Sequence, residues 1–220
     1  MQTIILASQS PRRKELLALL SVPFTVQESR IDERALDAAD TLAGIRRTPA
    51  QKAAAMAEAK GLDVSRTAPV DSIIIAADTI VAQGEEILHK PKDAADAIQM
   101  LHRLSGNTHT VHTGMSVIYK SEQNEIVHTS VSSTQVVFRP LTDAEIRAYV
   151  ATEEPLDKAG AYGIQGKGAF CVERLEGDYY TVVGLPLTKL YLELRENGVC
   201  LTDFWQSSPS RLDTNQIQSY

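Results

Sequence analysis

The stretch at residues 8–14 (SQSPRRK) has the residue types of a phosphate-binding helix start, with Ser10 placed to cap a helix that begins one residue later. A helix N-terminus carries partial positive charge and unpaired N–H groups, so cations in its first turn cost roughly 0.3–1 kcal/mol each. A bound phosphate would offset that cost, which makes Ser8, Arg12 and Arg13 candidate ligands. The alternative is an ordinary cap with solvated cations, and the sequence favours neither.

An acidic residue follows a buried strand in the second stretch. Residues 72–77 (SIIIAA) form a continuous apolar run that predicts a central strand covered on both faces, and Asp78 is expected at its exit. Open α/β sheets place their ligand crevice at such strand ends. A carboxylate there can hold a hard cation or accept a proton from water. A turn or capping aspartate is equally common, so this pattern is weak by itself.

Isolated charged residues elsewhere could face the same crevice. Lys90 precedes Pro91 after a turn expected at Gly84, and Lys52 and Glu33 are similar single charges. Most such residues are solvated, so the sequence alone favours a surface position for each of them.

The fourth stretch, residues 153–168 (EEPLDKAGAYGIQGKG), contains glycines at positions 160, 163, 166 and 168. We expect these glycines to let the backbone approach a ligand closely. Asp157, Lys158 and Gln165 supply polar groups, and a glutamine amide can read the edge of a base. The spacing matches neither a P-loop nor GxGxxG, and a purely structural glycine-rich loop is about as good an explanation.

Three further patterns do not support a site. His109 and His112 are an odd number of positions apart in a strand-like segment, so they should face opposite sides and not share a metal. Ser10 lacks a GxSxG elbow or a nearby His–Asp pattern, which disfavours nucleophilic hydrolysis. Cys171 and Cys200 lack a CxxC pattern, which indicates two reduced thiols rather than zinc or a disulfide framework.

The elements that must position these residues mix strands and helices without strict alternation. We therefore predict an α/β fold with a mixed sheet rather than a Rossmann domain. Apolar runs and alternation predict strands at 3–7, 24–27, 72–77 and within 108–138, with a hairpin of 170–175 and 179–183. Caps and periodicity predict helices at 10–20, 48–60 (stopped by Gly61), 93–104, 142–150 and 186–196.

Length and composition describe a folded protein with an acidic surface. The 220 residues are 43% hydrophobic, which is enough for one large domain or two small ones. The net charge of −6 argues against non-specific binding to nucleic acid or anionic membranes. No signal peptide or membrane helix is recognisable, so we expect a cytoplasmic protein. We expect one domain at 1–205 and a disordered polar tail at 206–220.

Taken together, the four stretches resemble the Maf family of nucleoside triphosphate pyrophosphatases over residues 3 to about 197. The matching blocks, in the family's order, are residues 8–17 (SQSPRRKELL), 77–79 (ADT), 90–91 (KP), 104–106 (LSG), 154–166 (EPLDKAGAYGIQG) and 183–186 (VGLP). The sequence departs from the family in its polar extension after Trp205 and in a longer segment around 37–47. The resemblance implies a fold like that of inosine triphosphate pyrophosphatases: a long, curved mixed sheet flanked by helices, with two lobes around a cleft.

The resemblance also implies an activity, namely cleavage of nucleoside triphosphates between the α- and β-phosphates with Mg²⁺ or Mn²⁺. Residues 157–166 are similar to the subgroup that acts on dTTP and UTP, and family members are linked to arrest of septum formation. Asp78 matches the catalytic carboxylate, as general base or metal ligand. The other positions carried over are Arg12, Thr79 and Gln165 for substrate choice, Ser8, Arg13, Lys52, Lys90 and Lys158 in the polar lining, and Glu33 with Asp78 at the metal.

Two other function classes stay open. One is a nucleotide-sensing regulator of septum formation with little turnover, which would bind triphosphate without releasing pyrophosphate. The other is a metal-dependent phosphatase, which would release orthophosphate. The sequence also leaves open whether the chain forms a homodimer and whether modified nucleotides are the true substrates.

Overall fold

The computed structural model describes residues 2–206, without the side chains of 33–37 and 206. The tail predicted at 206–220 therefore lies outside the described residues, except for the backbone of Gln206. The strands are β1 (Thr3–Leu6), β2 (Thr25–Val26), β3 (Ser72–Gln83), β4 (Glu86–Leu88), β5 (Thr108–Lys120), β6 (Glu125–Phe138) and β7 (Val172–Glu176). The α-helices are α1 (Pro11–Ala18), α2 (Glu33–Leu42), α3 (Pro49–Ser65), α4 (Ala94–Leu104), α5 (Asp143–Val150), α6 (Tyr179–Val183), α7 (Leu187–Glu196) and α8 (Leu201–Gln206). Three short 3-10 helices are η1 (Glu154–Asp157), η2 (Ala159–Ala161) and η3 (Lys167–Cys171).

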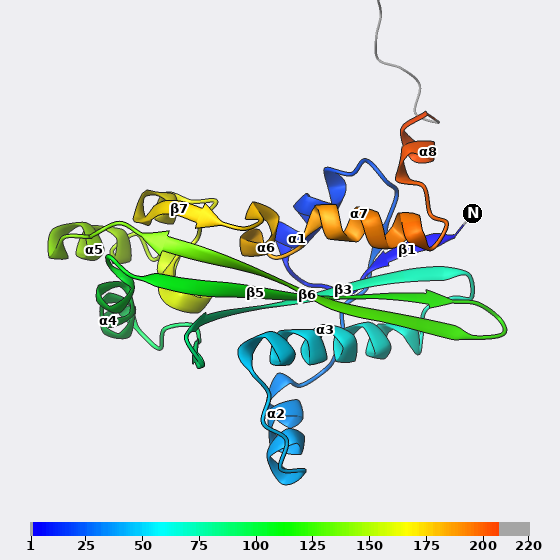
Figure 1. Ribbon diagram of the computed structural model, residues 1–220, viewed down its shortest axis with the longest axis horizontal. Helices are drawn as coiled ribbons and strands as arrows, with labels where there is room; N and C mark the ends of the chain where they lie inside the picture. The colour runs from blue at the N-terminus through cyan, green and yellow to red at the C-terminus, as the bar shows by residue number, and fades with distance from the viewer. Residues whose placement is uncertain (1, 207–220) are drawn as a thin grey trace, which may run out of the picture.

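All seven strands belong to one open mixed sheet, which confirms the predicted fold class. Their order is β2-β1-β3-β5-β6-β7, and β4 pairs with β3 outside this path. β1 runs parallel to β2 and β3, whereas the long strands β3, β5 and β6 pair antiparallel. The three long strands extend along the length of the molecule, and the helices pack against them (Figure 1).

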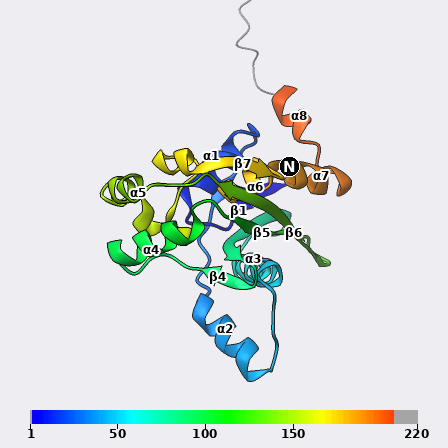
Figure 2. The same ribbon diagram turned by 60° about the vertical axis from the view of Figure 1, so that its left-hand side comes forward.

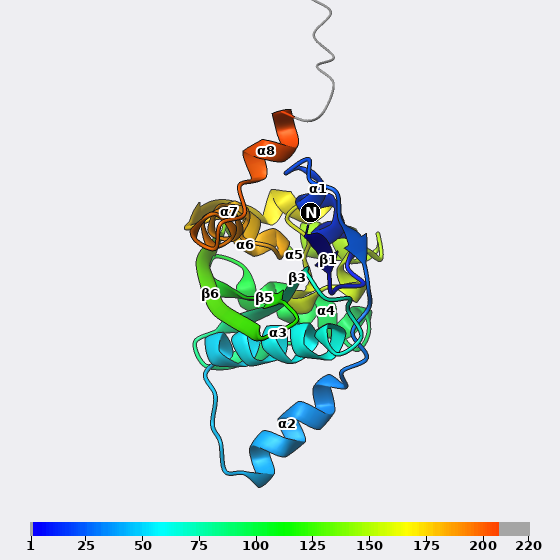
Figure 3. The same cartoon turned by 90° about the vertical axis from the view of Figure 1, so that its right-hand side faces the viewer.

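Helices cover both faces of the sheet. α3 lies along one face, while α1, α6 and α7 lie on the other (Figure 1; Figure 3). α4 and α5 pack at one end of the long strands (Figure 2), and α2 extends away from the body (Figure 3). None of the helices within residues 2–206 is long and apolar enough to cross a membrane.

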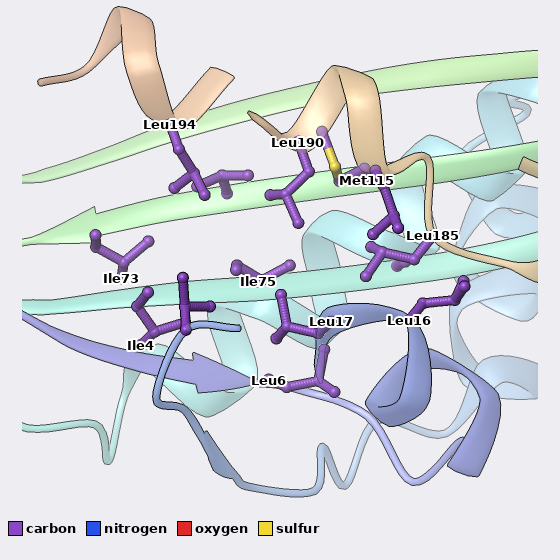
Figure 4. Packing of buried hydrophobic residues seen from close by; sticks show 14 of the residues in the cluster. Ile4, Leu6, Leu16, Leu17, Ile73, Ile75, Met115, Leu185, Leu190 and Leu194 are labelled. Carbon is purple, nitrogen blue, oxygen red and sulfur yellow. The ribbon is translucent and has the colours of Figure 1, made fainter. Parts of the chain in front are cut away.

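The apolar core divides into clusters that belong to different parts of the sheet. One cluster lies between the sheet and α1 and α7, where Leu17, Ile75 and Leu190 point toward one another (Figure 4). A second joins α4, α5 and the segment around Tyr162 at the end of the long strands. A third lies under α3. The first two clusters form two halves of the molecule, in agreement with the predicted two lobes.

Four of the predicted helix starts are confirmed by their caps, and α7 begins at the predicted place without a side-chain cap. The hydroxyl of Ser10 caps α1, and complete capping boxes open α3 at Thr48 and α5 at Thr142. Asp93 caps α4, whose amphipathic pattern places Leu101 in the core. These starts follow from local side chain–backbone hydrogen bonds, which a sequence shows directly.

The predicted stop of the helix 48–60 at Gly61 is wrong, because this helix, α3, continues to Ser65. Gly61 is buried against the sheet, where a β-carbon would lie 2.9 Å from the Cδ1 of Ile118. On the sheet side, a β-carbon at Gly114 would lie 2.1 Å from the carbonyl oxygen of Ala53. Both glycines therefore serve a close backbone approach between α3 and β5 rather than a helix end.

The predicted hairpin after residue 170 is also wrong. Val172–Glu176 is a strand that pairs with β6, but Tyr179–Val183 forms helix α6. The carboxylate of Asp178 accepts a hydrogen bond from the backbone N–H of Thr181 at 2.7 Å and caps this helix. The Glu-Gly-Asp sequence therefore acts as a helix entry, which β-propensity alone did not reveal.

Candidate active site

Asp78 lies in the middle of β3, not at its exit as the sequence predicted. The register of β1 with β3 ends at the pair Leu6 and Ile75, and β4 joins the same edge only at Val81. No described strand pairs with residues 76–80 on this edge. The edge of β3 is therefore open between β1 and β4, and Asp78 lies in this open stretch.

Asp78 forms an ion pair with Lys60 of α3, at 2.7 Å between Oδ1 and Nζ. Both side chains are largely buried, with 15% and 16% of their surface exposed. Lys60 was not among the predicted site residues; the sequence only predicted it as the last residue of a helix that ends before Gly61. The signal that could have found it is the helical spacing of the buried Ala53, Ala57 and Val64, which puts Lys60 beside the sheet-facing stripe.

Arg13 fastens the first turn of α1 to the site. Its guanidinium donates to the carbonyl of Gly184 at 2.9 Å, to the hydroxyl of Thr79 at 3.1 Å and to the hydroxyl of Ser8 at 3.4 Å. Thr79 in turn lies 3.0 Å from the hydroxyl of Thr113 on the neighbouring strand. The N-terminus of α1, which has no acidic residue in its first turn, is thereby held beside β3.

The glycine-rich segment forms the opposite wall. The Nζ of Lys158 donates to Asp157 at 2.5 Å and to the carbonyl of Glu154 at 2.8 Å. The hydrogen bond from Lys158, together with the charge of Arg12, lowers the pKa of Asp157. The charge of Arg12 on α1 therefore acts on Asp157 of this segment. Gln165 is exposed and lines the same cavity as Arg12.

The glycines of this segment make room for protein groups, which is a different reason from the predicted approach of a ligand. A β-carbon at Gly163 would lie 2.7 Å from the Cε of Lys158. At Gly168 it would lie 2.4 Å from the hydroxyl of Tyr149. Gly160 has a φ of 71°, a conformation that favours glycine.

Three adjoining cavities surround this site: Lys90 lines all three, whereas Asp78 and Lys60 each line two of them. The cavity between α1 and the glycine-rich segment has a volume of about 390 Å³, and its lining includes Arg12, Arg13, Lys60, Asp78, Thr79, Lys90, Lys158 and Gln165. A polar cavity of about 380 Å³ beside it is lined by Ser8, Ser10, Arg13, Lys60 and Lys90, among others. A third, of about 640 Å³, reaches Lys52 and includes Asp78, Thr79 and Lys90. The structure thus brings together every predicted site residue except Glu33, which begins α2 and whose side chain lies outside the described residues.

The residues present fit a hard cation that arrives with phosphate. No group of three His, Cys, Asp or Glu side chains that could hold a metal occurs among the side chains that the structure describes. Magnesium typically uses one or two carboxylates together with substrate phosphates, which Asp78 could satisfy. His109 is buried against Tyr162, whereas the Nδ1 of His112 lies within hydrogen-bond distance of the Ser133 hydroxyl, so the two histidines have different partners.

Comparison with known proteins adds the decisive observation. The family model described as Maf-like protein matches residues 3–197. This chain belongs to the Maf family. A dTTP/UTP pyrophosphatase of Bacillus cytotoxicus is 48% identical over 196 residues, which cover 89% of this chain and 96% of that protein. Proteins of the same name from Bacillus cereus (strain AH187) and Bacillus anthracis are 45% identical over 202 residues, covering 92% of this chain and 99% of each. Five of the six Maf-family blocks recognised in the sequence contribute to the cavity at Asp78, whereas the block at 104–106 lies at the end of α4, outside the three cavities.

Proposed function

We propose that this chain hydrolyses dTTP and UTP between the α- and β-phosphates, releasing the nucleoside monophosphate and pyrophosphate. The observation that carries the proposal is the meeting of Asp78 with Arg12, Arg13, Lys60 and Lys90 at one opening in the sheet. Relatives at 45–48% identity over most of the chain carry the name dTTP/UTP pyrophosphatase. A nucleotide-pool function in the cytoplasm and a link to cell-division arrest belong to the same proposal.

The cations would bind the triphosphate and stabilise the charge that develops as the anhydride breaks. Lys90 lines all three cavities and Lys60 lines two of them, so these lysines can follow a phosphate chain across the opening. Preorganised positive groups in a partly enclosed site act mainly by stabilising transition-state charge. Arg13 would contribute through the helix start it holds in place, where backbone N–H groups also face an anion.

Asp78 would supply the reacting carboxylate. Lys60 occupies its Oδ1, which leaves Oδ2 to accept a proton from the attacking water or to bind a cation. Asp78, with Glu33, would hold Mg²⁺ or Mn²⁺, which when bound would offset phosphate charge. Both roles of Asp78 require the same open edge of β3.

Gln165, Arg12 and Thr79 would select the nucleobase. They line the same cavity of about 390 Å³. A pyrimidine edge presents donors and acceptors that an amide can match, whereas an unmatched purine would leave polar groups unpaired.

A panel of nucleoside triphosphates with Mg²⁺ or Mn²⁺ tests the proposal. We expect pyrophosphate and monophosphate from dTTP and UTP, with little turnover of ATP or GTP. Orthophosphate, detected without added pyrophosphatase, would instead indicate a phosphatase. Tight triphosphate binding without either product would indicate a nucleotide-sensing protein.

A further inference from the structure

The carboxylate of Glu154 gathers donors from the far end of the glycine-rich segment. Its Oε2 accepts from the backbone N–H of Lys167 at 3.0 Å, and its Oε1 accepts from the backbone N–H of Gly168 at 3.1 Å. Burial alone raises the pKa of Glu154, but these two amides and the nearby Tyr149 and Lys158 outweigh it and hold the pKa below its usual value. Glu154 is therefore ionised at neutral pH, when such amide bonds are strongest.

Tyr149 of α5 extends the same contact to the near end of the segment. Its hydroxyl donates to Oε1 of Glu154 at 2.9 Å and accepts from the backbone N–H of Gly163 at 3.1 Å. The two side chains thus hold both ends of the turn 163–168. Gln165 lies between these ends, and no described residue hydrogen-bonds its side chain.

The glycines confirm that this contact is built into the backbone. A β-carbon at Gly166 would lie 2.5 Å from Oε1 of Glu154, and one at Gly168 would lie 2.4 Å from the Tyr149 hydroxyl. A side chain at either glycine would displace the carboxylate of Glu154 or the hydroxyl of Tyr149. Neither Glu154 nor Tyr149 lines any of the three cavities at Asp78, so both act from behind the turn.

We propose that Glu154 and Tyr149 are positioning residues that fix the turn 163–168, and through it Gln165, so that they determine nucleobase selectivity without touching the substrate. This inference rests on the proposed function. It predicts that removing the Glu154 carboxylate, which lies behind the turn, weakens selectivity for the nucleobase but leaves phosphate binding unchanged.

The test compares Glu154→Gln and Tyr149→Phe with Glu153→Gln, which changes the adjacent exposed carboxylate. We expect Glu154→Gln to lower kcat/KM for UTP about tenfold while turnover of ATP stays unchanged, because an ill-placed Gln165 no longer favours the pyrimidine. The inhibition constant of tripolyphosphate, which has no base, should stay within about twofold. Amide hydrogen exchange at Lys167 and Gly168 should accelerate in Glu154→Gln but not in Glu153→Gln.

Coupling to Gln165 separates positioning from a general structural role. In a Gln165→Ala background, Glu154→Gln should cause no further loss with UTP. Three results would overturn the proposal. They are an equal fall in kcat/KM for UTP and ATP, a fall for UTP that is as large in the Gln165→Ala background as in the wild type, and unchanged amide exchange at Lys167 and Gly168. If Glu154→Gln does not fold, Tyr149→Phe, which removes one hydroxyl, is judged by the same criteria.

Failure of the proposed function would be recognised separately. If the wild-type protein releases no pyrophosphate from any nucleotide, the positioning role is decided by UMP affinity and amide exchange. Weaker UMP binding in Glu154→Gln than in Glu153→Gln supports it, and equal affinity for the two variants overturns it.

Discussion

Two cationic side chains act at Asp78 and its neighbour in different ways. Lys60 binds one oxygen of the carboxylate, while Arg13 holds Thr79, the next residue of the strand. Alternation along β3 sends these two neighbours to opposite faces, so each meets a cation from a different helix. The family resemblance identified Asp78, Thr79 and Arg13, but the Lys60 partner became visible only once α3 was placed on the sheet.

Replacing the carboxylate should stop the reaction and leave the fold intact. We expect Asp78→Asn to lower kcat for UTP by about 10²–10⁴-fold, the range for losing a positioned acid–base group. Pyrophosphate release and the thermal midpoint measure the two effects. Asp71→Asn, at an exposed left-handed position before the same strand, is the control and should retain full activity. Near-normal turnover in Asp78→Asn would disprove the assignment.

Lys60 should matter for turnover more than its helix position suggests. We expect Lys60→Met to lower kcat/KM for UTP to below about a tenth of the wild-type value, because a largely buried carboxylate and the phosphates both lose a cation. Arg66→Met, which removes an exposed cation at the end of the same helix, should change kcat/KM little. Equal effects of the two substitutions would place Lys60 outside the catalytic machinery.

The buried His109 should make stability depend on pH. Burial lowers the pKa of His109 from 6.5 to about 4. Below pH 6.5 the unfolded chain takes up a proton that the folded protein resists, so the stability falls between pH 6.5 and 4, by up to about 3 kcal/mol. Urea unfolding at pH 7.5 and pH 5 measures the difference. The double variant His109→Leu/Tyr162→Phe removes the imidazole and its hydrogen-bond partner together, and it should flatten this dependence. An unchanged slope in the double variant would contradict the prediction.

Among the elements, α3 shows what local sequence rules predict and what they do not. Its capping box fixes the start at Thr48, because the cap depends on residues three positions apart. Its end was mispredicted because Gly61 is explained by Ile118 of β5, which is remote in sequence. Helix α6 was missed for a different reason, because its local cap at Asp178 was interpreted as part of a hairpin turn. Helix starts are local features, whereas glycine positions record tertiary contacts.

The interface between α3 and β5 should tolerate one glycine substitution and not the other. At Gly114 a β-carbon meets the backbone of Ala53, so we expect Gly114→Ala to cost about 3 kcal/mol or more. At Gly61 it lies 2.9 Å from the end of the flexible Ile118 side chain and 3.4 Å from the β-carbon of Ala76, so Gly61→Ala should cost about 1 kcal/mol or less. Chemical denaturation measures both free energies of unfolding. A reversed order would show that α3 does not pack on β5 as described.

For the whole molecule, the chain order of the blocks says little about where they meet. α1 packs into the first apolar cluster and most of the segment 157–165 into the second, with Ile164 contacting both, yet the start of α1 and this segment line one cavity. The family resemblance predicted a cleft between two lobes. It could not show that the cleft depends on where β1 ends and β4 begins, because that is a property of strand register.

The opening in the sheet has a further consequence for solubility. Residues 78–80 present an unpaired strand edge within an apolar sheet, the kind of surface on which a strand of another molecule can be added. A charged side chain in the middle of such an edge opposes that addition, since the incoming strand would have to desolvate it. We therefore expect Asp78 to protect the folded protein from intermolecular β-pairing in addition to its proposed role in the reaction. Variants that replace it with a β-branched apolar residue should aggregate more readily than Asp78→Asn, and static light scattering during incubation would reveal the difference.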